Sequence, residues 1–293
     1  EYVNQKGAPI VIKADGLAAG KGVVVAATLH EAHVAIDDML LGNKMGNAGA
    51  RVVIEDFLQG EEASFIVMVD GDNVLPMATS QDHKRLLDDD CGPNTGGMGA
   101  YSPAPVVTSD VYERAMNEII LPTVNGMKAE GHKFTGFLYA GLMIDKTGAP
   151  YTVEFNCRFG DPETQPIMSR LNSDLVDLLE AAIDGKLNST IAEWNPQTAV
   201  GVVLAAENYP DTPKKGDIIT GLDEADRIGK VFHAGTALNE NGKVVTNGGR
   251  VLCVVGLGDN VAAAKTKAYQ AVQKISFDGM QYRKDIADKA INR

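Results

Sequence analysis

A polar segment directly after an apolar run constrains the fold of this chain most strongly. Residues 151–153 are Tyr-Thr-Val, and Glu154, Asn156 and Arg158 then stand at every second position. In a strand, alternate side chains point to the same face, so this spacing would project a carboxylate, an amide and a guanidinium into one space. Oxygen ligands suit Mg²⁺, and a fixed cation can stabilise a phosphoryl group in transfer. The alternative from the residues alone is an edge strand with a solvated polar face.

Length, charge and cysteine content narrow the class of protein. The chain has 293 residues, of which 44% are hydrophobic and 23% charged, and a formal net charge of −12. This length suits roughly two domains with ordinary globular cores. The negative charge argues against nonspecific binding to nucleic acid or an anionic membrane. Cys91, Cys157 and Cys253 are too widely spaced for a disulfide framework or a zinc knuckle, and they fit a reducing cytoplasm.

The patterning predicts three parts. Residues 1–61 predict a small α/β unit, residues 62–193 a larger unit, and residues 194–293 a final α+β unit. In the first unit, Thr28 and Glu31 have capping-box spacing at the start of a helix that runs to about residue 41. The residues 81–105 are polar and glycine-rich without periodicity, which predicts a long structureless loop that is either functional or disordered. The strands are expected at 9–14, 23–26, 51–54, 64–69, 73–77, 136–144, 151–155, 202–205, 230–234, 243–245 and 251–255. Further helices are expected after Thr108, at 173–185, at 260–275 and at 282–291. Pro122 is expected to kink or end the helix that follows Thr108.

A glycine-rich segment near the start invites two readings. Residues 13–22 read Lys-Ala-Asp-Gly-Leu-Ala-Ala-Gly-Lys-Gly, which is not a P-loop, because three residues rather than four separate the first two glycines and Gly22 replaces the hydroxyl residue. One reading is a lid between two antiparallel strands, whose backbone N–H groups approach phosphates while Lys13 supplies a point charge. The other is a plain glycine hairpin with a solvated lysine.

Further polar segments are less specific. Residues 55–58 run from a strand into a turn, where backbone groups could read an adenine edge, although a solvated acidic turn is the alternative. Residues 81–85 and 92–101 combine basic groups with glycines, which suits a second anion. The His-Glu-Ala-His sequence at 30–33 lacks the spacing of a zinc protease and predicts the exposed side of a helix.

Taken together, the segments 12–22, 80–85, 93–103 and 154–163 resemble the ATP-grasp superfamily and, within it, the glycinamide ribonucleotide synthetase (phosphoribosylamine–glycine ligase) family. The resemblance covers essentially the whole chain. It implies an α+β fold in which a small α/β lid subdomain and a larger antiparallel-sheet subdomain are followed by a small α+β C-terminal domain. The family's N-terminal substrate domain is not in this sequence, so we expect poor turnover from this chain alone.

The resemblance also implies a reaction in purine biosynthesis. ATP would phosphorylate the glycine carboxylate, and the amine of 5-phosphoribosylamine would displace phosphate, with Mg²⁺ or Mn²⁺ as the metal. A cytoplasmic monomer without nucleic-acid or membrane partners is implied. Two alternatives stay open: another ATP-grasp carboxylate–amine ligase or carboxylase, and a nucleotide-binding fragment without catalysis.

The resemblance assigns roles to individual residues. Those for the ATP phosphates and the lid are Lys13, Gly16, Gly20, Lys21 and Gly22, and those for adenine and ribose are Glu55, Asp56, Phe57, Leu58 and Glu62. The metal ligands would be Glu154 and Asn156, and the catalytic cations Arg158 and Lys13. The substrate residues would be His83, Lys84, Arg85, Asn94, Thr95, Gly96, Gly97, Asp161 and Glu163. One departure is that residues 141–143, Gly-Leu-Met, stand where many ATP-grasp enzymes have a further acidic metal ligand.

Overall fold

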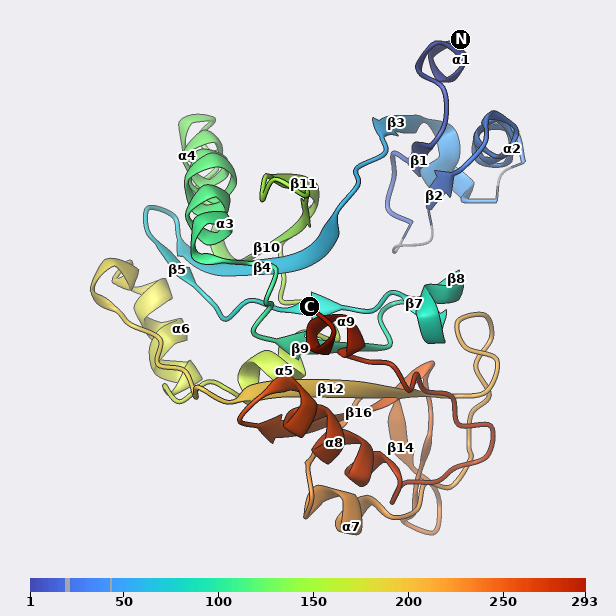
Figure 1. Ribbon diagram of the computed structural model, residues 1–293, viewed down its shortest axis with the longest axis vertical. Helices are drawn as coiled ribbons and strands as arrows, with labels where there is room; N and C mark the ends of the chain where they lie inside the picture. Colours follow the sequence, from blue (N-terminus) through green and yellow to red (C-terminus); the bar gives the residue numbers. More distant parts are fainter. Residues whose placement is uncertain (19–21, 43) are drawn as a thin grey trace. The chain divides into compact units, whose positions relative to one another are not determined.

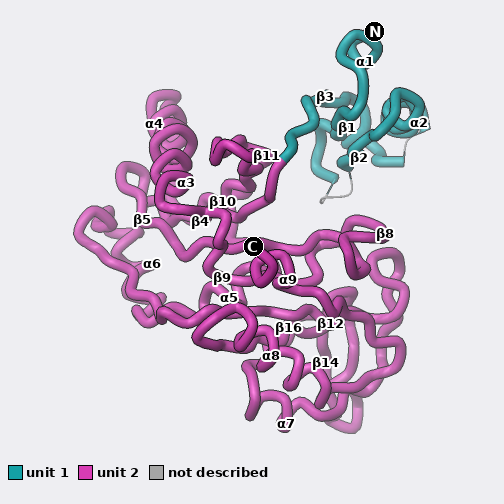
Figure 2. The backbone as a smooth tube through the Cα atoms, in the orientation of Figure 1, with its two compact units in different colours: residues 1–59 teal, residues 60–293 magenta. Residues whose placement is uncertain are grey.

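The computed structural model describes residues 1–18, 22–42 and 44–293 (Figure 1). The chain divides into two compact units, residues 1–59 and residues 60–293, which are coloured separately in Figure 2. Among the described residues, no helix is both long enough and apolar enough to span a membrane.

The first unit is a small sheet with a helix packed against it. The sheet has the order β2-β1-β3, and β1 is antiparallel to both neighbours. The predicted capping pair is confirmed, because Thr28 Oγ1 accepts a hydrogen bond from Glu31 N at 3.2 Å and Glu31 Oε2 accepts one from Ala27 N at 2.8 Å. The elements are α1 (Tyr2–Lys6), β1 (Ile10–Ala14), β2 (Val23–Ala26), α2 (Leu29–Leu40), η1 (Gly46–Ala50) and β3 (Val52–Asp56).

The second unit contains an antiparallel sheet of the order β11-β10-β4-β5. The strands β4 (Glu61–Asp70) and β10 (Thr135–Ile144) pair along their whole length. Successive β4 side chains enter different cores, because a strand alternates its faces: Phe65 packs with the helical segment 109–129, whereas Ile66 packs with α6 (Leu175–Ile183). The remaining elements of this part are β5 (Val74–Pro76), α3 (Ser109–Arg114), η3 (Ala115–Ile120), α4 (Leu121–Ala129), β11 (Pro150–Asn156), α5 (Thr164–Met168) and η4 (Leu187–Ser189).

A further sheet of the same unit joins distant parts of the chain. Its order is β13-β16-β12-β9-β6, so that β6 and β9 from before the predicted boundary at 193/194 share a sheet with strands from after it. The helix α8 covers one side of β16 and β12. The division into three domains stays a prediction. The elements are β6 (Gln81–Asp82), β7 (Arg85–Leu87), η2 (Asp88–Asp90), β8 (Cys91–Asn94), β9 (Gly99–Ser102), β12 (Thr198–Ala205), α7 (Leu222–Asp226), β13 (Lys230–His233), β14 (Thr236–Leu238), β15 (Val244–Thr246), β16 (Arg250–Gly258), α8 (Val261–Val272) and α9 (Asp288–Ile291).

Three local predictions were wrong or incomplete. The residues 81–105 are not a structureless loop, because they contain β6, β7, β8 and β9, whose partners partly lie far away in the sequence. The last predicted helix is shortened to α9, since residues 282–287 form contacts with the 83–90 segment instead. Pro122 does not end its helix. It stands in the first turn of α4, directly after the π-helical segment η3, where a missing N–H group is tolerated.

Candidate active site

The polar face of β11 carries the predicted metal ligands. Glu154 and Asn156 lie two positions apart in this strand, and Asn156 Nδ2 is 3.4 Å from Glu154 Oε1. The side chain of Glu154 is exposed and that of Asn156 is half-buried. Arg158 follows the end of the strand, and its Nη1 donates to Phe159 O at 2.8 Å. The predicted common face therefore holds for the carboxylate and the amide, whereas the guanidinium lies on irregular backbone.

The strand beside β11 places a tyrosine and a glycine, but no carboxylate, opposite this pair, and Tyr139 of β10 is the cross-strand partner of Asn156. Gly141 of β10 is the cross-strand partner of Glu154, and a Cβ at position 141 would lie 3.2 Å from Glu154 Cγ. Within the described residues, no group of three or more His, Cys, Asp or Glu side chains is arranged to hold a metal ion. The pair thus offers two oxygen ligands, which fits a cation that takes its remaining ligands from phosphate and water.

A lysine and several carboxylates lie beside this strand. Lys84, just after β6, forms an ion pair with Glu62 of β4, with Nζ 2.6 Å from Oε2. Burial disfavours the charge of Lys84, but the carboxylates of Asp82, Glu62 and Glu154 outweigh this and raise the pKa of the ammonium group. A residue predicted for the substrate side and one predicted for ribose are therefore brought together.

Glu163 is an internal hydrogen-bond acceptor rather than an exposed substrate ligand. Its side chain is buried, and its Oε1 accepts from Ser64 Oγ at 2.8 Å and from Tyr139 OH at 3.0 Å. Burial, and next the negative charge of Glu163, raise the pKa of the half-buried Asp82 to about 7. Asp82 was not among the residues expected at the site, although its position two residues before Lys84 was a usable signal.

The glycine-rich turn after β8 is built on the backbone of Lys84. Thr95 donates to Lys84 O through its N–H at 2.7 Å and through Oγ1 at 2.8 Å, and Gly97 N donates to Thr95 Oγ1 at 3.0 Å. Gly97 has a φ of +116°, and a Cβ there would lie 2.3 Å from Pro162 Cδ. Only glycine fits this approach. Asn94 and Gly96 are exposed at the turn.

Asp161 is already engaged by a residue that the sequence analysis missed. Arg250, at the start of β16, donates from Nη2 to Asp161 Oδ2 at 2.9 Å. Its Nη1 donates to Asp161 O at 2.8 Å and to Gly96 O at 2.6 Å. Asp161 is thus bonded within the site while its side chain is 54% exposed, and its substrate contact stays a prediction. No sequence signal pointed to Arg250, because it belongs to no motif and lies far along the chain.

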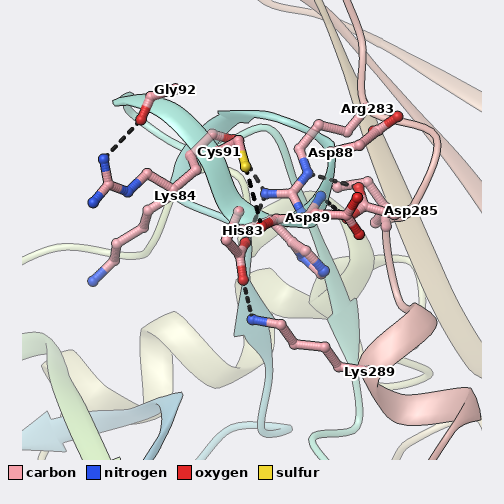
Figure 3. Close-up of polar contacts among 12 residues, drawn as sticks. His83, Lys84, Asp88, Asp89, Cys91, Gly92, Arg283, Asp285 and Lys289 are labelled. Carbon is pink, nitrogen blue, oxygen red and sulfur yellow. Dashed lines mark hydrogen bonds and ion pairs between the residues drawn. The ribbon is translucent and has the colours of Figure 1, made fainter.

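His83 occupies the core, in place of the predicted substrate contact. Its side chain is only 3% exposed, and its Nε2 accepts from Ala287 N at 3.3 Å. Its Nδ1 is buried without a hydrogen-bond partner among the described residues. Burial, followed by the positive charges of Arg283 and Lys289, lowers the pKa of His83 to about 4. Figure 3 shows how these two residues reach the 83–92 segment.

The same C-terminal segment fixes the turn before β8. Arg283 donates to both carboxylate oxygens of Asp285, at 2.7 and 2.6 Å, and to Asp90 Oδ1 at 2.9 Å (Figure 3). Asp285 Oδ2 also accepts from Asp89 N at 2.9 Å. Arg85, next to Lys84, donates to Gly92 O at 2.7 Å. Arg85 is thus occupied within its own hairpin.

The residues of the first unit that were predicted to bind the nucleotide lie in or next to its strands β1, β2 and β3. Lys13 of β1 forms an ion pair with Glu55 of β3, with Nζ 2.6 Å from Oε2. The antiparallel strands β1 and β2 flank the glycine-rich segment as predicted. Gly16 N donates to Ala48 O at 3.0 Å, while Gly20 and Lys21 lie outside the described residues. The other residues of this set are Gly22 before β2, Asp56 at the end of β3, and Phe57 and Leu58 after it.

Comparison with known proteins identifies the relatives of this arrangement. Residues 1–164 match the family described as phosphoribosylglycinamide synthetase, ATP-grasp (A) domain, and residues 199–289 match the corresponding C domain. The chain is 87% identical over 293 residues to phosphoribosylamine–glycine ligase of Neisseria meningitidis serogroup B. The match covers all of this chain and 69% of that protein. It is 66% identical over 292 residues to the protein of the same name from Ralstonia nicotianae, again covering 69% of it.

Solved structures agree with these matches. The crystal structure of phosphoribosylamine–glycine ligase from Thermotoga maritima is similar with a TM-score of 0.86 and 39% identity, over 98% of this chain and 71% of that chain. Biotin carboxylase from Campylobacter jejuni is similar with a TM-score of 0.68 and 15% identity, over 99% of this chain and 63% of that chain, a likeness that concerns the fold alone. The predicted ATP-grasp fold is confirmed.

Proposed function

Because this chain belongs to the phosphoribosylamine–glycine ligase family, we propose that it catalyses the ATP-dependent joining of glycine to 5-phosphoribosylamine in purine biosynthesis. A glycine carboxylate oxygen attacks the γ-phosphorus of ATP, and ADP leaves. The amine of 5-phosphoribosylamine then attacks the acyl carbon of glycyl phosphate. Phosphate leaves, the nitrogen loses a proton, and glycinamide ribonucleotide is formed. The observation that carries the proposal is the 87% identity over the whole chain to a relative of this name.

We assign the divalent metal to Glu154 and Asn156. Their side chains are adjacent on one face of β11 and each carries an oxygen ligand, and no group of three or more acidic, histidine or cysteine ligands gathers there in the described part of the chain, which suits a hard cation that also binds phosphate oxygens. When bound, Mg²⁺ neutralises charge on the phosphates; Mn²⁺ is the alternative. Arg158, exposed just past the strand, supplies a cation for the transferring phosphoryl group.

The nucleotide is assigned to the first unit and to Glu62. Lys13 binds ATP phosphates in exchange for its ion pair with Glu55, and the glycine-rich sequence 16–22 is assigned to the same phosphates as the lid. The residues 55–58 bind the adenine edge, and Glu62 binds ribose. An acyl phosphate must be kept from water, which is the physical reason for a lid over this chemistry.

The substrate side is assigned to Lys84 and the turn 94–97. Lys84 carries its charge among carboxylates, and the turn presents the exposed side chain of Asn94, while the N–H groups of Thr95, Gly96 and Gly97 are bonded internally. His83, Arg85 and Glu163 support this surface from within, as their internal partners indicate, and the half-exposed Asp161 is assigned to the surface itself. Anionic and zwitterionic substrates suit a lysine beside an amide side chain.

The test is ADP release with each substrate omitted in turn, measured on the full-length polypeptide that carries this sequence. We expect release to require glycine and to rise with 5-phosphoribosylamine. Release that ignores glycine but responds to bicarbonate or another carboxylate would favour a different ATP-grasp ligase or carboxylase. ATP binding by calorimetry without any turnover would favour a nucleotide-binding fragment.

Location and assembly are part of the same proposal. We expect a cytoplasmic monomer, since the substrates are small polar metabolites and the charge of −12 disfavours nucleic-acid and anionic-membrane surfaces. Cell fractionation and light scattering check these two expectations.

A further inference from the structure

One arginine connects two separate segments of the proposed substrate surface. Arg250 Nη1 donates to Gly96 O at 2.6 Å and to Asp161 O at 2.8 Å, while Nη2 lies 2.9 Å from Asp161 Oδ2. The Arg250 side chain is 22% exposed, so these charge-assisted bonds are partly shielded from water. The two accepting segments are 65 positions apart in the sequence and meet through this guanidinium.

A tyrosine holds the same turn through its other backbone group. Tyr209 OH accepts from Gly96 N at 2.8 Å. Gly249 lies directly before Arg250, and a Cβ at position 249 would lie 2.4 Å from Tyr209 Cδ2. The Tyr209 ring therefore packs against the backbone next to Arg250. The N–H and C=O groups of Gly96 are therefore bonded to Tyr209 and Arg250, which both come after position 198.

The turn packs closely against this arginine. A Cβ at Gly96 would lie 2.8 Å from Arg250 Cζ, and a Cβ at Gly97 would lie 2.3 Å from Pro162 Cδ. The guanidinium is planar and reaches two carbonyl oxygens and a carboxylate at once, which a lysine ammonium on a flexible stem cannot reproduce. The position of the turn therefore depends on Arg250 specifically.

We propose that Arg250 is a positioning residue, which fixes the 94–97 turn against Asp161 so that both face glycine and 5-phosphoribosylamine in one geometry. The inference rests on the proposed function and deepens it by giving the C-terminal strand β16 a part in substrate binding. Arg250 contacts neither of the residues assigned to the metal. Its loss therefore weakens the binding of glycine and 5-phosphoribosylamine, here called the acceptor substrates, and not the binding of ATP.

The experiment compares Arg250→Gln, Arg250→Lys and Arg114→Gln in the full-length polypeptide. Arg114 is the matched control, because it also bonds a carboxylate (Glu118) and a backbone carbonyl (Gly148 O), but on α3. For Arg250→Gln we expect KM for glycine or 5-phosphoribosylamine to rise about 10- to 100-fold, the size of effect that a misplaced binding group produces. KM for ATP should change less than about twofold, Arg250→Lys should be intermediate, and Arg114→Gln should match the parent.

Two further measurements keep the outcome decisive. Millimolar guanidinium should partly restore the acceptor KM of Arg250→Ala, which a general loss of stability would not allow. If the Arg250 variants do not fold, Tyr209→Phe removes the bond to Gly96 N alone and should raise the acceptor KM in the same direction.

The results separate this inference from the proposed function. Parent-like acceptor KM values in Arg250→Gln, or equal increases for ATP and glycine, would overturn the positioning role alone. If the Arg250 variants do not fold, an unchanged acceptor KM in Tyr209→Phe would likewise overturn the positioning role. A parent protein whose ADP release ignores glycine would overturn the proposed function and, with it, this inference.

Discussion

Gly141 of β10 lies directly opposite Glu154 of β11, and a Cβ at position 141 would lie only 3.2 Å from Glu154 Cγ. The glycine leaves the carboxylate without a side chain directly opposite it on β10. It also means that β10 contributes no acidic ligand at this position, so the metal assigned to β11 depends on Glu154 and Asn156.

Replacing the carboxylate should therefore affect chemistry more than folding. We expect Glu154→Ala to lower kcat by roughly 10²–10³-fold, the usual result of removing one preorganised electrostatic partner. The melting temperature should stay close to that of the parent, because the side chain is exposed. Glu113→Ala, which removes an exposed carboxylate of α3, serves as the control. Unchanged kcat in Glu154→Ala would remove this residue from the mechanism.

Lys13→Ala should weaken ATP binding. A charge-assisted hydrogen bond contributes about 1.5–3 kcal/mol, which corresponds to a rise in Kd of roughly 10- to 100-fold. The matched control is Lys6→Ala, since Lys6 also forms an ion pair with a β3 carboxylate (Asp56, 3.4 Å) but has no assigned role. Titration calorimetry with ATP compares the two, and equal affinities in both variants would contradict the phosphate role of Lys13.

Asp82→Asn should stabilise the protein in a pH-dependent way. Burial and Glu163 raise the pKa of Asp82 to about 7, so the folded protein holds a proton that the unfolded chain releases between about pH 4 and pH 7. The asparagine variant avoids this loss of stability. Its gain should be about 1–4 kcal/mol at pH 8 and should disappear near pH 4. Urea unfolding at both pH values measures it; a difference that does not depend on pH would argue against a titrating Asp82.

His83 should make the protein less stable in acid. The pKa of the buried imidazole is lowered to about 4, so the unfolded chain binds a proton that the folded protein does not between about pH 6.5 and pH 4. Stability therefore falls as the pH drops through this window, by up to about 3 kcal/mol. His83→Phe should flatten that slope, although it loses the bond from Ala287 N. The slope of unfolding free energy against pH tests this, and an identical slope in the variant would exclude His83 as its source.

Local patterns predicted the parts of the fold that depend on neighbouring residues. The capping residues Thr28 and Glu31 placed the start of α2, and the every-second spacing of Glu154 and Asn156 placed them on one face of β11. The strands inside 81–105 could not be predicted, because β9 is stabilised by β12, about a hundred residues away. Such short strands have no periodicity of their own to detect.

The site was predictable only where its residues cluster in the sequence. The motif containing Lys84 and the Glu-x-Asn pair could be found by reading along the chain, and the resemblance to known ligases gave them roles. Arg250 and Arg283 act through a backbone carbonyl and a distant carboxylate, and Tyr209 acts through a backbone N–H group. Those partners become visible only in three dimensions, and for the same reason His83 and Glu163 looked like substrate ligands in the sequence.

The most direct test of the whole account is oxygen transfer from glycine to phosphate. The full-length polypeptide is given ATP, 5-phosphoribosylamine and glycine labelled with ¹⁸O in its carboxylate, and the released phosphate is examined by mass spectrometry. Activation of glycine as an acyl phosphate predicts one labelled oxygen in each phosphate formed together with product. Product formation with unlabelled phosphate would contradict the mechanism assigned to this site.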